Sequence, residues 1–538
     1  MTDLKDPRSL ALEPVPPSFP LTSDRPWITY AARARMRPVL YPVGILAGFV
    51  LFLLVKWGVS PYSAGRPLLI ALAAGLALPW LFGLLVGDRH RAGMLAILVV
   101  LFLLAGQSTL VAVLLAGVFA ILLAEGWTSR GRPRRIRWPA ITRAMSMVTA
   151  ILLVATGILA IQNGGIVRIP HDLVAEAPIG RFGSPATAAT DPPPSVYLVL
   201  LDGYPRADKL MTEFGIDNEP FVRALRERDF TVAERSRSNY VVTALTLASM
   251  FGGGVPSAAD VDSAEFRIAS ASFINDGPIL EEFRDRGYDV VAFSSGFEGV
   301  ALRTADRFVD TGQLNEFEWE LLQLSGLAPV FDVVQPTMLA DQHRARVVAT
   351  FGAALSVAAE PAQRPRLVFV HVPSPHSPQV FGPSGQPIEI RGLQVPFDDS
   401  EEHWLLGSEE YGRRLAGQIT YVNGRVLGLV DAIVQADPKA VVVVFSDHGS
   451  GIREVATTAA GTDPDLRTAN LLAVRSPGQR GIIDDRSTLV NLLPRILPAI
   501  IRPTPSAGTR TAPLISAFSS ISFCAAISIS GFAVITML

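Results

Sequence analysis

The chain has 538 residues, of which 49% are hydrophobic and 18% are charged. Its formal net charge of -2 gives no indication of a nucleic acid partner, and its one cysteine, Cys524, excludes an intrachain disulfide. Most of the hydrophobic excess lies in the first third of the sequence, which predicts a membrane module joined to a globular domain.

Long apolar runs fill residues 39–162, the predicted transmembrane module. Val39–Val55, Leu68–Val86 and Ala144–Ile161 each approach the ~20 residues that span a bilayer as a helix. Met94–Ala124 is too long for one span, because at ~1.5 Å per residue it exceeds a hydrocarbon core of ~30 Å. A turn at residues 106–108 would divide it, so we predict about five spans.

Arginine clusters support this count. They precede the first span and lie between the second and third and between the fourth and fifth, at Arg33, Arg35, Arg37, Arg89, Arg91, Arg130, Arg132, Arg134, Arg135 and Arg137. The positive-inside rule makes all of them cytoplasmic if there are five spans, with residues 1–38 inside and everything after Ile161 outside. A four-span alternative would leave the globular domain in the cytoplasm. The polar, Pro-rich N-terminus does not resemble a cleavable signal peptide.

One helix is enough for an anchor, so five suggest a bundle that holds or positions a lipid. A simple tether is the alternative. Residues 163–194, rich in Gly, Ala and Pro, read as a semi-extended linker. Residues 504–538 form an apolar tail, within which Leu514–Leu538 could be a sixth span, a buried segment or an aberrant end.

Residues 195–503 alternate short apolar strands with amphipathic helices, which predicts an α/β domain with a largely parallel central sheet. The expected strands are Val196–Leu201, Val290–Ser294, Leu367–Val372, Val441–Phe445 and Leu471–Val474. The expected helices are Glu219–Arg228, Pro278–Asp285 and a long one that carries Leu415 to Ile433 at spacings of three and four.

Two of these strands end on metal-competent side chains. Asp202 follows the first strand, and Asp447 and His448 follow the fourth. Open α/β sheets bind ligands at the carboxyl edge of their strands, so two carboxylates delivered there suggest a metal-dependent enzyme.

Two further segments offer reactive groups. Thr243 and Thr246 stand where a polar stretch gives way to helix formers, and a hydroxyl at a helix start beside a metal could attack phosphorus or sulfur. A simple N-cap is the commoner role for threonines at such positions. His376 lies in a Pro-rich loop after the third strand, where it could bind a phosphoryl oxygen or protonate a leaving group. Arg303 is a candidate for binding a substrate anion, whereas His343 and His403 read as surface residues.

Together these segments resemble the alkaline phosphatase/sulfatase superfamily over residues 195–503. Residues 200–208 (LLDGYPRAD) look like its opening segment, in which the aspartate binds metal, and Asp447-His448-Gly449 looks like its closing one. Residues 243–251 (TALTLASMF) resemble the nucleophile segment of the phosphoethanolamine transferases, Thr-Ala-x-Ser-x-Pro-Cys-Met-Phe, although Ala248 and Ser249 replace the Pro and Cys. The segment lacks the oxidisable residue of formylglycine sulfatases.

Threonine nucleophiles characterise the membrane-anchored lipoteichoic acid synthase-like and phosphoethanolamine transferase-like branches, which carry five spans before an extracytoplasmic domain. The resemblance implies one divalent metal ion (Mn, Zn or Mg) held by Asp202, Thr243, Asp447 and His448, with catalytic Thr243 and a substrate-side His376. Those branches usually have Glu where this chain has Asp202. No histidine follows His448, so a full second metal site is not expected.

The implied function is that of a multi-pass, metal-dependent phosphotransferase or phosphodiesterase of the cell membrane, with its catalytic domain outside the cytoplasm. Its substrate would be a lipid or envelope-polymer phosphoester. A sulfuric ester or phosphate monoester hydrolase of the same superfamily is one alternative. A catalytically silent envelope scaffold is another. The sequence does not give the substrate, the metal, the oligomeric state or the choice between transfer and hydrolysis.

Overall fold

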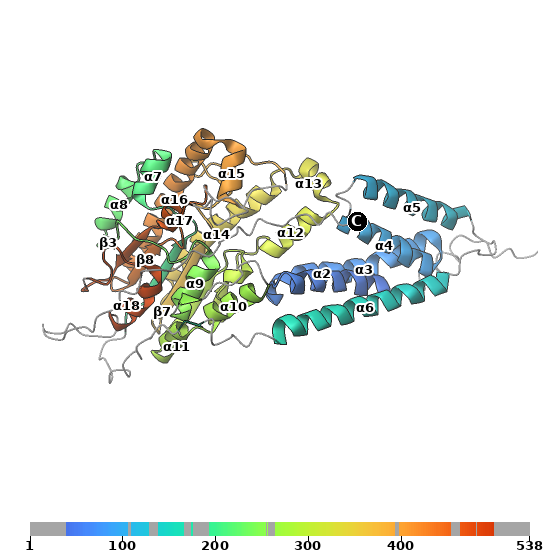
Figure 1. Ribbon diagram of the computed structural model, residues 1–538, viewed down its shortest axis with the longest axis horizontal. Helices are drawn as coiled ribbons and strands as arrows, with labels where there is room; N and C mark the ends of the chain where they lie inside the picture. Colours follow the sequence, from blue (N-terminus) through green and yellow to red (C-terminus); the bar gives the residue numbers. More distant parts are fainter. Residues whose placement is uncertain are drawn as a thin grey trace, which may run out of the picture.

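A computed structural model describes residues 39–105, 109–128, 138–165, 174–175, 193–253, 255–256, 264–392, 398–452, 463–479 and 481–499. The N-terminal segment 1–38, the arginine cluster of 130–137, most of the linker and the tail 504–538 lie outside these residues. A bundle of helices occupies one end of the long axis and an α/β domain the other (Figure 1).

The described part of the bundle contains five helices and a short 3₁₀ turn, while five membrane spans stay a prediction. They are α2 (Tyr41–Lys56), η1 (Pro61–Ala64), α3 (Gly65–Val86), α4 (Arg89–Ala105), α5 (Thr109–Thr128) and α6 (Trp138–Gly165). The run predicted to divide forms α4 and α5, which end and begin on either side of residues 106–108. Among the described residues, Pro61–Val86 and Trp138–Gln162 are long and apolar enough to cross a membrane by themselves.

The helices of the bundle alternate in direction. A side-chain carbon on Gly93, near the start of α4, would lie 2.3 Å from Val39 Cγ2, just before α2. The Arg91 guanidinium lies 5.3 Å from the ring centre of Trp138, the first residue of α6. The starts of α2, α4 and α6 therefore share one end of the bundle, away from the α/β domain (Figure 1).

The opposite end of the bundle is fastened to the α/β domain. Arg66 of α3 donates to both carboxylate oxygens of Glu318, at 2.6 and 2.5 Å, and to the carbonyl oxygen of Gly312 at 2.8 Å. Phe317 packs into an apolar cluster that includes buried residues of α2 and α3, and its ring meets that of Trp57 edge to face. Polar and apolar contacts thus join α12 (Glu316–Leu324) to the connection between α2 and α3.

The sheet of the α/β domain has seven strands in the order β3-β9-β8-β2-β7-β5-β6. The strands are β2 (Val196–Leu201), β3 (Phe230–Val232), β5 (Asp289–Phe293), β6 (Arg307–Val309), β7 (Arg366–Val372), β8 (Val441–Phe445) and β9 (Leu472–Arg475). The run from β8 to β6 is parallel, and β9 is antiparallel to both of its neighbours. The largely parallel sheet and all five predicted strands are confirmed.

Helices cover both faces of this sheet because its strands bury alternate side chains in two separate cores. On β2, Val199 and Leu201 face a core that includes buried residues of α14 and α16, whereas Leu198 and Leu200 face one that includes α9, α11 and α18. The helices of the domain are α7 (Ala207–Phe214), α8 (Glu219–Arg226), α9 (Thr243–Gly252), α10 (Ala264–Asn275), α11 (Pro278–Asp285), α12, α13 (Ala328–Val334), α14 (Met338–Ala359), α15 (Asp399–Leu406), α16 (Ser408–Ala436), α17 (Pro464–Thr468) and α18 (Leu492–Ala499). The three predicted helices correspond to α8, α11 and α16. Two short 3₁₀ turns complete the domain, η3 (Glu298–Val300) and η5 (Leu489–Asn491).

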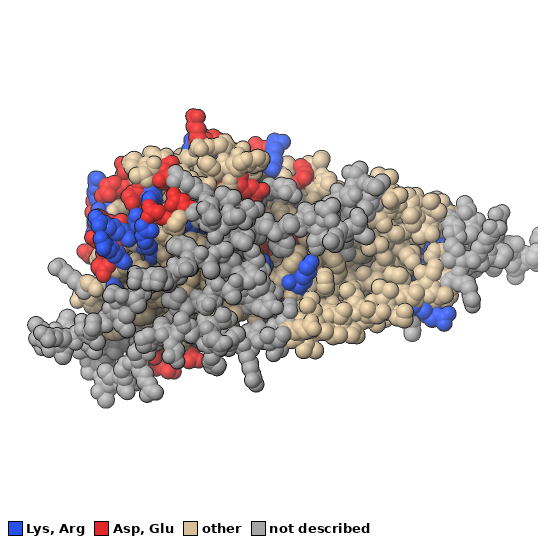
Figure 2. Space-filling view, viewed as in Figure 1, with Lys and Arg blue, Asp and Glu red and all other residues tan. Residues whose placement is uncertain are grey.

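The predicted linker departs from expectation in one place. Val174–Ala175 forms a strand, β1, that pairs antiparallel with β4 (Val255–Pro256) of the α/β domain. The linker is therefore not wholly without regular structure. Charged side chains gather over the α/β domain on the face shown in Figure 2, and the helical bundle carries few.

Candidate metal centre

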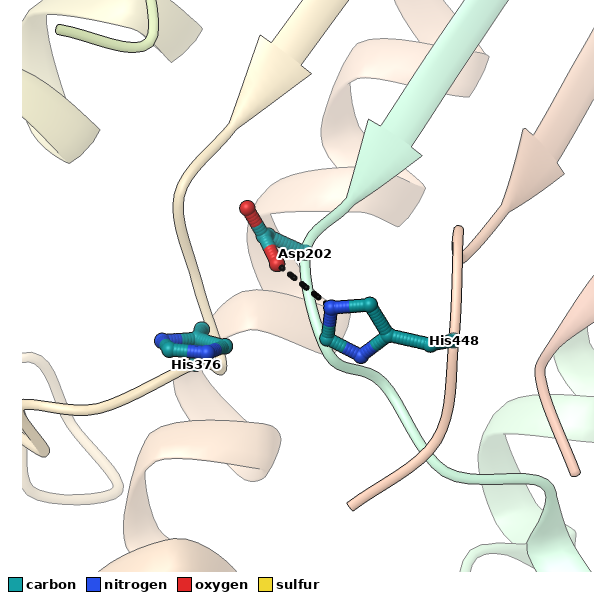
Figure 3. A group of neighbouring side chains, drawn as sticks. All are labelled: Asp202, His376 and His448. Atoms are coloured by element: carbon teal, nitrogen blue, oxygen red, sulfur yellow. Dashed lines mark ion pairs between the residues drawn. The ribbon is translucent and has the colours of Figure 1, made fainter. Parts of the chain in front are cut away.

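Three neighbouring parallel strands carry the predicted site residues to one edge of the sheet. β2 lies between β8 and β7, and the three strands run in the same direction. Asp202 follows β2, His376 lies in the loop after β7, and Asp447 and His448 follow β8. Figure 3 shows Asp202 at the end of its strand, with His376 and His448 approaching from either side.

Asp202 uses one carboxylate oxygen for the fold and leaves the other uncommitted. Its Oδ2 accepts a hydrogen bond from His371 Nε2 at 3.1 Å. Its buried Oδ1 has no hydrogen-bond partner among the described residues and lies 3.6 Å from His448 Nε2. Burial would raise the pKa of Asp202, but the His371 hydrogen bond and the positive charge of His376 hold it well below its usual range.

Asp447 likewise uses one carboxylate oxygen for the fold and leaves the other without a hydrogen-bond partner among the described residues. The backbone N–H of Gly203 donates to its Oδ1 at 3.2 Å. Its buried Oδ2 makes no hydrogen bond within the described part of the chain and lies 3.2 Å from His448 Nε2. Two carboxylate oxygens, one from each strand end, therefore face the same imidazole nitrogen.

The tautomer of His448 follows from its other nitrogen. Nδ1 lies 2.9 Å from the carbonyl oxygen of Gly449, which can only accept a hydrogen bond, so Nδ1 carries the hydrogen. In the neutral ring Nε2 then presents its lone pair to the carboxylates. Burial and the positive charge of Arg467 lower the pKa of His448, which favours this neutral form.

Thr243 completes the group. It is the first residue of α9, as the sequence predicts, and its half-buried side chain places Oγ1 3.4 Å from His448 Nε2. The other three predicted metal ligands thus converge on His448 Nε2. Val242, which precedes the helix, offers no side-chain cap to its free N–H groups.

These positions fit a divalent cation. The three oxygens lie 3.2, 3.4 and 3.6 Å from His448 Nε2. In a tetrahedral site with metal–ligand distances of about 2.0–2.1 Å, neighbouring ligand atoms are about 3.3–3.4 Å apart. Leaving a buried polar atom unpaired costs roughly 1–3 kcal/mol, and more when it is charged. A cation between the two carboxylate oxygens and the lone pair would remove that cost.

His376 lies against the same group from the other side. Its backbone N–H donates to the carbonyl oxygen of Asp202 at 2.9 Å, and its ring lies over Gly203, where a side-chain carbon would meet His376 Cδ2 at 3.0 Å. The carbonyl oxygen of Ser377 accepts from Nδ1 at 3.1 Å, which leaves Nε2 available. Burial would lower the pKa of His376, but the carboxylates of Asp399 and Asp202 raise it to about 9.

This position gives His376 two possible roles. One ligand atom from each of Asp202, His376 and His448 lies within 4.8 Å of the others, so His376 could also coordinate a metal. The sequence prediction places it on the substrate side instead. Its raised pKa favours a protonated ring, which would bind an anion or donate a proton but could not bind a metal.

Thr246 is buried one turn into α9, and its hydroxyl donates to the carbonyl oxygen of Asp447 at 3.2 Å. Thr246 therefore helps to fix the strand end that carries Asp447 and His448, and it does not face their side-chain atoms.

Asp399 and Arg467 are site residues that sequence reasoning missed. Buried Asp399 accepts from Ser377 N and Oγ at 3.2 and 2.9 Å and from Gly451 N at 3.0 Å, so it joins the His376 loop to the His448 loop. Arg467 donates to the carbonyl oxygens of Val241 at 3.0 Å and of Gly449 at 3.2 Å. Both hold segments next to site residues without reaching His448 Nε2 themselves.

Other expectations need correction or are left aside. His371, given no role from sequence, orients Asp202; a histidine inside an otherwise apolar strand was its only signal. His343, expected at the surface, is buried, and burial lowers its pKa to about 3. Arg303, the candidate for binding a substrate anion, pairs with Glu298 and stacks on the ring of Phe308. Its guanidinium is therefore already engaged by neighbouring side chains.

The chain belongs to the sulfatase family, because the model of that family matches residues 194–500, more than half of its length. This confirms the predicted alkaline phosphatase/sulfatase superfamily and supports an enzyme of that superfamily. A sequence search of curated proteins finds no match to the chain.

Several solved structures are similar to this one. The zinc complex of the C-terminal periplasmic domain of EptC from Escherichia coli is 16% identical, covers 56% of this chain and 81% of its own, and has a TM-score of 0.36. The integral membrane lipooligosaccharide phosphoethanolamine transferase A from Neisseria meningitidis is 13% identical and has a TM-score of 0.37. The match covers 88% of this chain and 95% of the transferase. The phosphonate monoester hydrolase of Agrobacterium radiobacter is 13% identical and has a TM-score of 0.36. The match covers 57% of this chain and 73% of the hydrolase.

The predicted ligands can be tested through Asp447. Asp447→Asn keeps the shape but loses a charged ligand, so purified protein should contain far less divalent metal than wild type by elemental analysis. Asp431→Asn, an exposed control, should keep the wild-type metal content. Unaltered metal content in Asp447→Asn would show that the ligand set is wrong.

The bridging carboxylate of Asp399 generates a second prediction. Asp399→Asn should lower turnover by about 10–100-fold, the usual cost of losing a group that orients functional side chains. Its metal content should stay at the wild-type level, because Asp399 accepts from Ser377 and Gly451 and does not face His448 Nε2. Full activity in the variant would contradict the positioning role.

Proposed function

We propose that the chain is a membrane-bound, metal-dependent phosphotransferase or phosphodiesterase with a threonine nucleophile. The observation that carries the proposal is the convergence of Thr243 Oγ1 and two buried carboxylate oxygens, from Asp202 and Asp447, on His448 Nε2. Hard oxygen donors with one imidazole suit manganese, zinc or magnesium, and no single one of these metals is favoured by the donor set.

Separate residues would bind the metal, attack phosphorus and protonate the leaving group. A divalent ion held by Asp202, Asp447, His448 and Thr243 would lower the pKa of the Thr243 hydroxyl and offset negative charge in the transition state. Thr243 Oγ1, once its hydroxyl proton has passed to water, would attack phosphorus, forming an Oγ–P bond as the bond to the leaving oxygen breaks. His376, protonated and adjacent, would give its proton to that oxygen. The free N–H groups at the start of α9 would hold a phosphoryl oxygen.

The second half of the reaction decides the class of enzyme. Attack on the phospho-threonine by an acceptor hydroxyl would transfer the group, and attack by water would hydrolyse it. In both cases the P–Oγ bond breaks and Thr243 is regenerated. A sulfuric ester or phosphate monoester hydrolase would use the same groups. A catalytically silent scaffold is less well supported, because burying two unpaired carboxylate oxygens beside His448 Nε2 is costly and a scaffold role would not require it.

The orientation of the helical bundle favours a substrate at the extracytoplasmic surface of the membrane. The starts of α2, α4 and α6 share the end away from the α/β domain. Each follows or contains one of the three arginine clusters, so the positive-inside rule would place that end in the cytoplasm. Five spans would then leave the α/β domain outside, facing lipid or envelope-polymer phosphoesters. A glycerophospholipid head group is the donor we favour.

The nucleophile can be tested with a pair of threonines in one helix. Thr243→Ala should reduce turnover about a thousandfold or more, because members of a catalytic unit fail together. Thr246→Ala should cost much less, since its hydroxyl supports the Asp447 carbonyl and does not face His448 Nε2. Mass spectrometry of enzyme trapped with substrate should place the phosphoryl group on Thr243. Near-normal activity of Thr243→Ala would refute the mechanism.

Topology is tested by reporter fusions. A reporter inserted at Gly180, after the last predicted span, should give an extracytoplasmic signal, and one at Gly131, inside the third arginine cluster, a cytoplasmic signal. A cytoplasmic signal at Gly180 would favour four spans and remove the extracytoplasmic substrate from consideration.

A further inference from the structure

Helix α13 carries mostly apolar side chains although it lies at the surface of the α/β domain. Its sequence, APVFDVV, has one charged residue, and none of its residues is buried. Val333 is 81% exposed, Val334 69% and Val330 52%. Surface helices of globular domains normally present polar residues to water, so an apolar exposed face indicates a partner.

The exposed face is not the one that holds the helix in place. Ala328 and Phe331 pack against the buried side chains of Trp319 and Leu339. Val330, Val333 and Val334 follow the same helical spacing on another side. α13 is therefore anchored to the domain by one apolar face and presents a second one outward.

The position of α13 indicates what that partner is. It follows α12, whose Phe317 packs with residues of α2 and α3 and whose Glu318 binds Arg66. In Figure 1, α13 lies on the side of the α/β domain that faces the bundle, level with the near ends of α2 and α6. The same end of the bundle exposes Leu69 and Ile70 of α3, at 67% and 68%.

We propose that α13 is an interfacial helix that inserts Val330, Val333 and Val334 into the outer surface of the bilayer beside the bundle. The inference rests on the membrane setting of the proposed function and adds a second contact with lipid, made by the α/β domain itself. Helices that lie in an interface bury their apolar face about 5–10 Å deep. Together with the Arg66–Glu318 junction, this contact would fix the tilt of the metal centre relative to the membrane surface.

The experiment measures how close individual positions lie to lipid. Val333→Cys, Met211→Cys and Ile70→Cys are made separately in full-length chain carrying Cys524→Ser, and each is labelled with a fluorophore. The proteins are reconstituted in phosphatidylethanolamine/phosphatidylglycerol vesicles containing lipids spin-labelled near the head group. Met211 is a matched control, since it is apolar, 48% exposed and on α7, at the far end of the α/β domain (Figure 1).

The label at Val333 should be quenched about twofold or more relative to the label at Met211, as expected of an inserted face. Val334→Cys should repeat the result, which guards against a folding defect in one variant. Quenching should not change with the protein-to-lipid ratio. Quenching at Val333 no stronger than at Met211, with Ile70 strongly quenched, would overturn the role of α13 and leave the proposed membrane setting intact.

Two other outcomes also overturn the proposal. If neither Ile70 nor Val333 is quenched, the bundle itself is not in lipid, and the membrane part of the proposed function fails as well. If Val333 is protected from a water-soluble quencher but not reached by the lipid quencher, and the protection grows with protein concentration, the valine face contacts a second copy of the chain.

Discussion

Unpaired buried acceptor atoms at one point govern the site. Asp202 Oδ1 and Asp447 Oδ2 lie 3.6 and 3.2 Å from His448 Nε2, and each of these three side chains is held there by a hydrogen bond made through its other polar atom. His371 fixes Asp202, the Gly203 amide fixes Asp447, and the Gly449 carbonyl fixes His448. None of the three can turn away without breaking a buried hydrogen bond, so the arrangement is prepared for a cation before one arrives.

A second layer of contacts holds these three groups in register with the loops around them. Arg467 reaches the backbone beside Thr243 and the Gly449 carbonyl that orients His448. Asp399 ties the segment after His376 to the segment after His448, and Thr246 supports the Asp447 carbonyl. These contacts therefore link the segments that carry Thr243, Asp447 and His376, which are three separate parts of the chain.

The residues at strand ends could be predicted because local pattern and topology agree there. An apolar β-branched run such as 441–445 forms a strand wherever it is buried, and parallel strands bring their last residues to one edge. Asp399 and Arg467 could not be predicted in the same way. An Asp in the first turn of a helix and an Arg within a helix have ordinary local roles, and only the packing of distant loops gives them partners. His343 was misplaced because α14 is long and its pattern does not show which face is covered.

The junction between bundle and domain fixes the position of the site relative to the helical bundle. Glu318 is almost fully buried and accepts both bonds from Arg66, while Phe317 beside it enters the apolar cluster of α2 and α3. A carboxylate paired in this way resists rotation about the junction more than an apolar contact alone, because its hydrogen bonds are directional. In the proposed membrane setting, the domain could then approach only those phosphoesters that lie within a fixed distance of the bilayer. Donor choice would depend on this geometry as well as on the chemistry of the site.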